Sequence, residues 1–464
     1  MYDTIIIGAG MSGLAAGIRL AYYDQRVCIL ERHSTIGGLN SFYRLRGRDY
    51  DVGLHAVTNF TPRGARKGPL ARLLRQLRFR WEDFALAPQW GSLIVFPETR
   101  LRFDNDIELL RSEVARVFPG QQAGFERLLG AIVDYDDLDE EAYRLSARDV
   151  LGGIVADPLL REMLLCPLMW YGNAREHDMD FGQFCIMFRS IYLEGLSRPL
   201  AGVRLILRNL VRRFRQLGGE LKLRSGVARI EVQEGRAAGV RLDDGPFLEA
   251  RQIVSSAGWL ETMRLCGDVR PVDELAAGQL SFCEAISILD RQPAELGHRE
   301  TIVFFNDSPQ FHWERPAALC DPRTGVVCSP NNFLYAEGGA GEHPLRDGVV
   351  RITALADYSR WATLPDEVYP LEKLRWYDRL LASAVRFVPD FRGRVIDTDM
   401  FTPKTIRRYT WHDNGAVYGA PRKRLDGTTH LPNLFVCGTD QGFVGIIGSI
   451  VSGISIANRH LLRG

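Results

Sequence analysis

The sequence begins with a short apolar strand, a glycine-rich turn, a helix, a second strand and an acid, and this unit restricts its fold more than any other feature. Thr4 to Ile7 form the predicted first strand and residues 27–30 the second, and both are mainly apolar. The turn GAGMSG at 8–13 follows the first strand directly. In a G-x-G-x-x-G turn, the first glycine permits a tight bend and the second lets the backbone approach a pyrophosphate. The third lets the helix pack closely on the strand, and unpaired N–H groups at the helix start face the phosphates. The pattern predicts a dinucleotide site.

The acid that follows the second strand, Glu31, narrows the choice of dinucleotide. A carboxylate at this position accepts hydrogen bonds from ribose hydroxyls and repels a 2′-phosphate, which disfavours NADP. A second glycine pair, Gly37-Gly38, comes six residues later, and the segment DVG follows at 51–53. An NAD dehydrogenase has no use for this second glycine turn. No other G-x-G-x-x-G follows a strand, so we expect no built-in NAD(P)H module.

Length and composition set further bounds. A chain of 464 residues is too long for one compact core, so we expect two domains. The net charge of +1 provides no overall field that would attract nucleic acid. The eight cysteines are scattered without metal-ligand spacing, which predicts buried reduced thiols, a reducing compartment and no metal site.

The C-terminal segment LPNLFVCGTDQGFVGIIGS (431–449) repeats the order of strand, glycine turn and helix with different residues. We expect a strand at 434–437 that ends at the turn residue Gly438. Asp440 then stands where a carboxylate can accept a hydrogen bond from a ribityl hydroxyl. Gly445 and Gly448 begin a long helix whose first N–H groups can face a cofactor.

Together, these segments resemble the FAD-binding parts of the flavin amine oxidase and phytoene desaturase superfamily. The resemblance is specific at 1–60, 217–260 and 401–462 and loose between them. It implies FAD as the cofactor, with Val227 contacting the adenine through its backbone. The predicted cofactor-binding residues are Gly8, Gly10, Met11, Ser12, Gly13, Glu31, Arg32, Gly37, Gly38, Leu39, Asn40, Val227, Gly438, Asp440, Gly445 and Ile446.

The fold class that this resemblance implies is α/β, with a Rossmann-type FAD-binding domain and an interleaved α+β substrate domain. We expect the FAD-binding domain at 1–75, 205–265 and 395–464, and the substrate domain at 76–204 and 266–394. Aromatic stretches of the substrate domain either line an apolar tunnel for an isoprenoid chain or form an ordinary core. These stretches are 164–173, 181–196 and 302–313.

Two segments are similar to the retinol saturase and carotenoid isomerase branch of the family. DVGLHAV (51–57) resembles its D-x-G-x-H segment, and 401–420 resembles its T-P-x-T…Y…G-x-x-Y-G segment. The resemblance implies a hydrophobic polyene or isoprenoid substrate, carotenoid- or retinoid-like, whose C=C bonds are formed by desaturation, saturated or isomerised between cis and trans. Leu39 departs from the pattern, because bacterial desaturases and amine oxidases usually have arginine there.

Few polar side chains are available for such chemistry. We predict that His55 is a catalytic group at the flavin face, with Tyr409 and Tyr418 behind it. Each of the three has an alternative interpretation as a core residue whose polar atoms are satisfied by the protein. An external electron donor or acceptor is expected.

The segment 63–81 reads as a basic amphipathic helix with seven Lys and Arg and no acid. Its leucines fall at helical spacing, so the helix either docks on an anionic membrane or packs on the core. Because we expect neither a signal peptide nor a membrane-spanning segment, the predicted location is cytoplasmic, peripheral to the inner face of a membrane.

Two other functions fit parts of the pattern. A flavin amine oxidase needs an aromatic cage and usually a lysine near the flavin, and the C-terminal third has only Lys373, Lys404 and Lys423. A non-catalytic prenyl-lipid escort of the GDP-dissociation-inhibitor type has a similar fold and uses no flavin. Glu31, Gly37-Gly38 and Asp440 favour a bound flavin over the escort.

Overall fold

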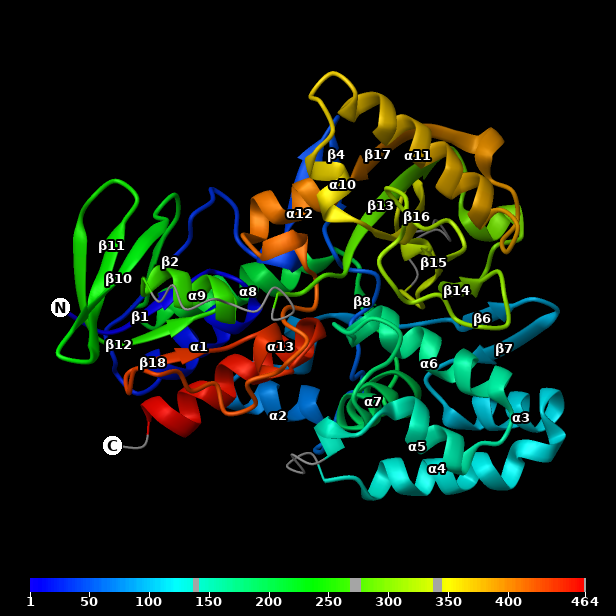
Figure 1. The fold of residues 1–464 in the computed structure, drawn as a ribbon, viewed down its shortest axis with the longest axis horizontal. Coiled ribbons are helices and arrows are strands. Elements are labelled where there is room, and N and C mark those ends of the chain that lie inside the picture. The colour runs from blue at the N-terminus through cyan, green and yellow to red at the C-terminus, as the bar shows by residue number, and fades with distance from the viewer. Residues whose placement is uncertain (137–141, 268–276, 337–343, 463–464) are drawn as a thin grey trace.

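The computed structural model describes residues 1–136, 142–267, 277–336 and 344–462 and contains two large sheets. Figure 1 shows the first sheet at one end of the molecule and the second at the other, with α12 (Pro403–Thr410) between them. Segments from the two ends of the chain lie side by side in the first sheet, because β18 pairs with β12 beside β1. The fold class predicted from the sequence, α/β with mixed sheets and helices, is confirmed.

The first sheet has the order β10-β11-β12-β1-β2-β9, with β18 paired to β12. Its centre is parallel, whereas β10 and β11 extend it as an antiparallel hairpin. The strands are β1 (Tyr2–Ile7), β2 (Val27–Leu30), β9 (Glu220–Lys222), β10 (Val227–Gln233), β11 (Arg236–Leu242), β12 (Phe247–Ser255) and β18 (Leu434–Val436). One face is covered by α1 (Met11–Ala21), α2 (Pro69–Gln76), α8 (Val203–Gln216) and α13 (Gly445–Ile456).

The second sheet has the order β17-β13-β16-β15-β14-β6-β7. Its strands are β6 (Ser92–Phe96), β7 (Thr99–Phe103), β13 (Ser281–Leu289), β14 (Ile302–Asn306), β15 (Thr324–Cys328), β16 (Gly348–Ala356) and β17 (Val395–Phe401). The sequence predicts residues from 395 onward in the FAD-binding domain, but β17 pairs with β13. Its backbone hydrogen bonds therefore join this strand to the second sheet.

Helices pack on both faces of the second sheet. On one face lies α11 (Tyr369–Ala384), together with α10 (Tyr358–Ala362). The other face meets a helical layer formed by α3 (Ile107–Val117), α4 (Gln122–Asp134), α5 (Ala147–Ile154), α6 (Pro158–Gly172) and α7 (Phe181–Phe188). Two short sheets, β3 (Phe42–Leu45) with β4 (Arg48–Asp51) and β5 (Leu86–Pro88) with β8 (Ser197–Pro199), and the helix α9 (Trp259–Leu265) complete the described elements.

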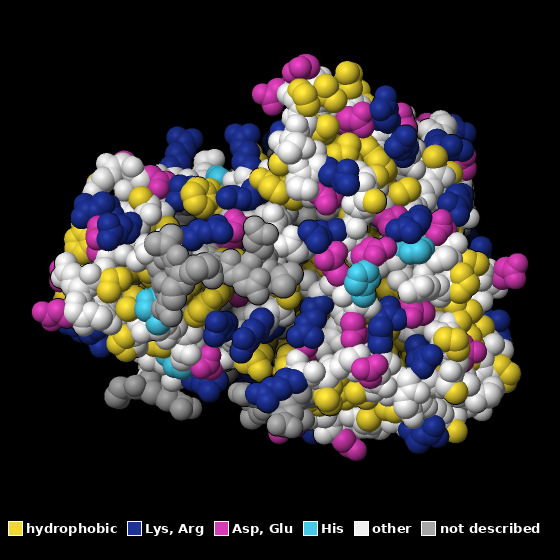
Figure 2. Space-filling view, in the orientation of Figure 1, with side chains coloured by type: hydrophobic (Ala, Val, Ile, Leu, Met, Phe, Trp, Pro, Cys, Tyr) yellow, Lys and Arg dark blue, Asp and Glu magenta, His cyan; other side chains and the backbone are white. Residues whose placement is uncertain are grey.

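The basic helix is shorter than the segment 63–81 and has no free apolar face. Only Pro69–Gln76 is α-helical, and Leu70, Leu73 and Leu74 are buried in the core beneath α13. Of the two alternatives, packing on the core describes these leucines, whereas membrane docking of the segment stays a prediction. Its basic side chains remain at the surface, and Figure 2 shows Lys and Arg near the place where Figure 1 has α2 and α13.

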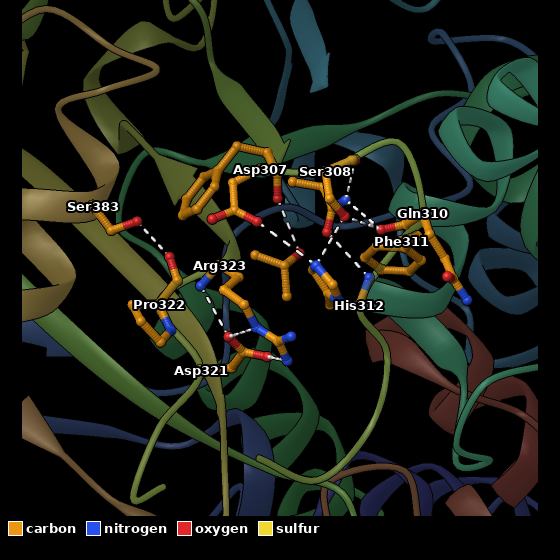
Figure 3. A network of polar contacts seen from close by, with 12 residues as sticks. Asp307, Ser308, Gln310, Phe311, His312, Asp321, Pro322, Arg323 and Ser383 are labelled. Carbon is orange, nitrogen blue, oxygen red and sulfur yellow. Dashed lines mark hydrogen bonds and ion pairs between the residues drawn. The ribbon is translucent and has the colours of Figure 1, made fainter. Parts of the chain in front are cut away.

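A polar network fixes the long loop after β14, shown in Figure 3. Asn306 Nδ2 donates to the carbonyls of Ser308 and Gln310, and Ser308 Oγ lies 2.9 Å from His312 Nε2. Asp307 approaches the same ring nitrogen at 3.6 Å, so the three side chains do not form a hydrolytic Ser-His-Asp relay. The network holds Trp313 against Trp170 of α6.

The structure also bears on the cysteines, on metal-ligand groups and on membrane-spanning helices. All eight cysteines are free thiols, and every one except Cys266 is buried. No group of His, Cys, Asp and Glu within the described ranges is arranged to hold a metal ion. Among the helices that the structure describes, none has the length and apolar character needed to cross a membrane.

Candidate functional site

A cavity of about 410 Å³ runs between the two sheets, and its wall draws on both. It starts at the glycine turn after β1 and extends to the central strands of the second sheet. All of the predicted cofactor-binding residues except Gly13 and Asp440 line it. The predicted catalytic residues His55, Tyr409 and Tyr418 line it as well.

The first glycine turn presents bare backbone to this cavity. Gly8 has a φ of +98°, and Gly10 forms the N-cap of α1 without a capping side chain. A Cβ on Gly10 would meet no atom within 4 Å, so the space in front of this helix start is open. Gly13 has the packing role that the motif predicts, since its Cβ would lie 2.2 Å from the Gly8 carbonyl oxygen. The turn thus leaves room for a ligand at Gly10 and none behind Gly13.

The second glycine turn lies directly against the first. Gly37 N donates to the Ala9 carbonyl at 3.0 Å, and Gly37 and Gly38 both have positive φ. A Cβ on Gly38 would also meet no atom within 4 Å. Two turns that the sequence separates by more than twenty residues therefore form one backbone cradle, with Leu39 and Asn40 at its edge.

Glu31 stands at the end of β2, 8% exposed, with its carboxylate oriented by two backbone donors. Ala9 N donates to Oε2 at 3.0 Å and His33 N donates to Oε1 at 2.9 Å. A carboxylate has lone pairs beyond these two, so the group can still accept from ribose hydroxyls. Arg32 donates to the Val227 carbonyl at 2.7 Å, which ties β2 to the start of β10 beside the cavity.

The C-terminal segment enters the cavity through Gly438, Gly445 and Ile446. Helix α13 begins there without a capping side chain, so a second helix N-terminus points into the same space as α1. Asp440 does not line the cavity. Its carboxylate accepts from Trp259 N at 2.6 Å and from Ala420 N at 2.7 Å, and the residue is 3% exposed. These two hydrogen bonds tie Asp440 to the segments at 259 and 420, and its ribityl contact stays a prediction.

At the other end, His55 meets the second sheet. Its Nε2 lies 2.9 Å from Thr353 Oγ1 and 3.6 Å from Glu284 Oε2. Glu284 pairs with Arg351, and both side chains are 3% exposed. Arg351 also donates to the carbonyls of Leu54 and Asp51, so the ion pair supports the segment that carries His55.

Burial decides the protonation of this group. It lowers the pKa of His55 below its ordinary 6.5, and the attraction of Glu284 offsets this only in part. Burial alone would raise the pKa of Glu284, but the Arg351 guanidinium and the hydrogen bond with His55 hold it below 4.5. At neutral pH the arrangement is a neutral imidazole beside a carboxylate–guanidinium pair.

Aromatic side chains enclose the space around His55. Trp170, Tyr171, Phe282 and Tyr418 all line it, and Tyr418 packs edge-to-face on Phe282 with ring centroids 5.9 Å apart. The hydroxyl of Tyr418 donates to the Trp170 carbonyl, and burial raises its pKa. Of the three aromatic stretches in the sequence, only 164–173 reaches the cavity, through Trp170 and Tyr171, while buried residues of the other two join the core.

Tyr409 lies at the opposite end from His55. It is 47% exposed and its ring packs on His33, next to Glu31 and Arg32. Its neighbour Trp411 receives the Arg32 guanidinium over its ring at 4.0 Å. Helix α12 packs on the second glycine turn, so Tyr409 lies near the nucleotide cradle, and its catalytic role stays a prediction.

Several cavity residues were not found in the sequence. Glu284 is the single charged residue of the β13 strand SFCEAISIL, and this lone acid was the available signal. Thr353 lies in β16, two residues after Arg351. His412 is buried 3.6 Å from Glu261, and although burial lowers its pKa, Glu261, Asp440 and Asp413 together raise it above 6.5. Neither histidine pairing is visible in the sequence, since each partner lies more than 150 residues away.

Comparison with known proteins gives one family match near the N-terminus and relatives that match 99% of the chain. The family model described as NAD(P)-binding Rossmann-like domain matches residues 6–77. The chain is 24% identical to a prolycopene isomerase of Arabidopsis thaliana, over 99% of this chain and 82% of that protein. It is 23% identical to an all-trans-retinol 13,14-reductase of Danio rerio, over 99% and 86%. An oxidoreductase structure from Methanosarcina mazei superimposes with a TM-score of 0.67 at 16% identity, over 98% and 100%.

Proposed function

We propose that this chain, which belongs to the phytoene desaturase, carotenoid isomerase and retinol saturase family, is an FAD-dependent oxidoreductase of hydrophobic polyenes or isoprenoids. It acts on C=C bonds by desaturation, saturation or cis–trans isomerisation. One observation carries the proposal: a single cavity joins the double glycine cradle to an aromatic chamber that contains His55. The relatives named for prolycopene and retinol support a carotenoid- or retinoid-like substrate.

The shape of the cradle fits FAD. Open space in front of Gly10 and Gly38 leaves room for a pyrophosphate, and two uncapped helix N-termini favour its negative charge. Glu31 suits the adenosine ribose, and Val227 with Arg32 lies at the adenosine end. When bound, the flavin supplies the hydride chemistry that no side chain can provide.

The residues of the chain orient the substrate and handle the proton. Trp170, Tyr171, Phe282 and Tyr418 exclude water from the chamber and contact an apolar chain. His55 is our proposed catalytic group for the proton that accompanies hydride transfer. Tyr418 shapes the wall, since its hydroxyl is already bound to the Trp170 carbonyl.

The alternative functions receive less support from the same cavity. The chamber has aromatic walls, as a flavin amine oxidase requires, but no lysine is among the described residues that line it. Lys423 donates instead to the Tyr418 carbonyl outside the cavity, where burial lowers its pKa to about 8. A prenyl-lipid escort has no need of the double cradle.

Two partners complete the proposal. The electrons pass to or from an external donor or acceptor, because the chain has one Rossmann turn only. The basic surface around α2 contacts an anionic membrane from the cytoplasmic side through its charges. Arg66, Lys67 and Arg72 are exposed there and pair with no carboxylate of the described chain.

The test of the proposed function is the visible absorption spectrum of the purified protein before and after denaturation. We expect bands of oxidised flavin, with intact FAD released on denaturation. Absence of flavin even after incubation with added FAD would contradict the enzyme and favour the escort. A flavin released as FMN would contradict the assignment of Glu31 and Val227 to an adenosine.

A further inference from the structure

Beside the cavity, a chain of hydrogen bonds leads from a buried ion pair to His55. Three of its members lie in the second sheet: Glu284 in β13, and Arg351 and Thr353 in β16. His55 comes from the segment after β4. The strands are held in register, since Glu284 is directly opposite Thr353 in the β13–β16 ladder. The donor and acceptor roles along this chain follow from the chemistry of its members.

Glu284 fixes the direction of the chain. As a carboxylate paired with Arg351 it can only accept hydrogen bonds. Thr353 Oγ1 donates its single proton to Glu284 Oε2 at 3.5 Å. The threonine oxygen is then left with lone pairs towards His55 Nε2 at 2.9 Å. The Nε2 atom also lies 3.6 Å from the Glu284 Oε2 carboxylate oxygen, so both of its neighbours favour a ring proton on Nε2.

The remaining ring nitrogen has a different environment. The other charged groups around His55 are Arg198 of β8 and Asp51 of β4, which form an ion pair. Arg198 donates to the His55 carbonyl and not to the ring. Cys328 of β15 likewise contacts only that carbonyl. No hydrogen bond from the described residues reaches Nδ1. A neutral imidazole protonated on Nε2 has its lone pair on Nδ1, in a side chain that lines the cavity.

We propose that Arg351, Glu284 and Thr353 act as positioning residues that hold His55 in the Nε2–H tautomer, so that Nδ1 removes a proton from the substrate. The inference rests on the proposed function and specifies desaturation as the direction of the reaction. With FAD bound, the oxidised flavin would accept a hydride from one C–H bond of the substrate. The electron pair of the neighbouring C–H bond would form the new C=C bond, and His55 Nδ1 would take its proton. The balance would be reduced flavin, an imidazolium and the desaturated substrate.

The arrangement serves desaturation better than saturation. Saturation needs an imidazolium in the starting state, and the buried position next to Arg351 and Arg198 disfavours that charge. The lowered pKa of His55 agrees with this reading of the geometry. A base that is already neutral at rest needs no proton loss before it reacts.

The test is histidine nitrogen NMR on the full-length protein with 15N-labelled histidine, with the His55 signals assigned by their loss in His55→Gln. We expect the Nε2–H tautomer at neutral pH. Thr353→Val removes the relay but leaves the Glu284–Arg351 pair intact, so it should yield a mixture of tautomers. Thr353→Ser should restore the wild-type signal. Ser287→Ala on β13, whose hydroxyl bonds Tyr377 and not the cavity, is the matched control and should change nothing.

Three outcomes would overturn the inference. These are an Nδ1–H tautomer in the wild type, an imidazolium at neutral pH, or an unchanged tautomer in Thr353→Val. Because the NMR readout needs no turnover, its result is separate from the flavin spectrum that tests the proposed function. A kinetic check follows once a polyene is oxidised: kcat should fall as pH decreases through the pKa of His55, whereas a rise would indicate saturation.

Discussion

The two ends of the cavity are built in opposite ways. The nucleotide end consists of backbone from two turns and two helix starts, and glycine sets its geometry. The chamber around His55 consists of side chains from separate strands and helices, brought together by the pairing of β13 with β16. Each turn of the backbone cradle is formed by a short stretch of neighbouring residues, whereas the side-chain chamber depends on the tertiary fold. Substitutions should therefore affect the two ends differently.

The largest effect on cofactor binding is expected at Gly10. Gly10→Val would fill the open space in front of α1, so the protein should fold and lose its flavin. We expect at least about a hundredfold weaker FAD binding, measured by titration of the apoprotein and equal to ~2.7 kcal/mol. Gly13→Ala is the matched contrast, because its Cβ meets the Gly8 carbonyl and should cost about 1–3 kcal/mol of folding stability. Equal flavin loss and equal stability in the two variants would contradict this division.

At the chamber end, His55→Gln should leave flavin binding intact and remove activity. The loss of kcat should be about 10²- to 10⁴-fold, the usual contribution of a general base. Tyr409→Phe serves as the control from the other end, since Tyr409 is far from the chamber, and should retain full activity. An inactive Tyr409→Phe with a normal His55→Gln would reverse the assignment of the two ends.

The buried ion pair of the chamber offers a test on stability. Glu284→Leu leaves Arg351 uncompensated, so its free energy of unfolding should fall by about 3–5 kcal/mol. The double variant Glu284→Leu/Arg351→Met removes both charges and should recover more than half of that loss. Denaturant unfolding of the wild type, Glu284→Leu, Arg351→Met and the double variant provides the measurement. A double variant destabilised by the sum of the two single losses would contradict this expectation, because it would show that the two side chains are not energetically coupled.

These contrasts also mark what the sequence alone could predict. The glycine turns of the cradle could be predicted from the sequence, because Gly8, Gly37 and Gly38 adopt positive φ angles that glycine favours. Gly10 has an extended backbone, and its lack of a side chain leaves the space in front of α1 open. The sequence does not show that the Asp440 carboxylate accepts from the backbone N–H groups of Trp259 and Ala420, because the tertiary fold brings these partners together. His55 was found through its motif, but Glu284 was not, since a single acid in an apolar strand has no fixed partner until the sheet forms. Likewise, the leucines of α2 gave the same pattern for a membrane and for a core.

The two buried histidines should respond to pH in opposite directions. The pKa of His55 is lowered, so its contribution to stability is lost as pH falls from 6.5 through the pKa in the folded state. The pKa of His412 is raised, so its contribution is complete below 6.5 and is lost as pH rises through the folded pKa. Relative to wild type, His412→Gln should be most destabilised near about pH 5 and His55→Gln near about pH 8. Chemical unfolding across this range measures both, and parallel profiles would contradict the assigned shifts.

The smallest effect concerns the outer surface around α2, where we expect the charge of the basic side chains to determine membrane binding. The leucines of α2 are buried, so only its cations can contact a membrane, and each should contribute about 1 kcal/mol at an anionic surface. The double variant Lys67→Glu/Arg72→Glu should therefore bind vesicles containing phosphatidylserine at least about tenfold more weakly in sedimentation, and salt should weaken the wild type in the same way. Arg379→Glu on α11, away from α2, is the control and should bind like wild type. If the wild type binds neutral vesicles equally well, apolar contact rather than charge holds the protein, and this surface is not the one that meets the membrane.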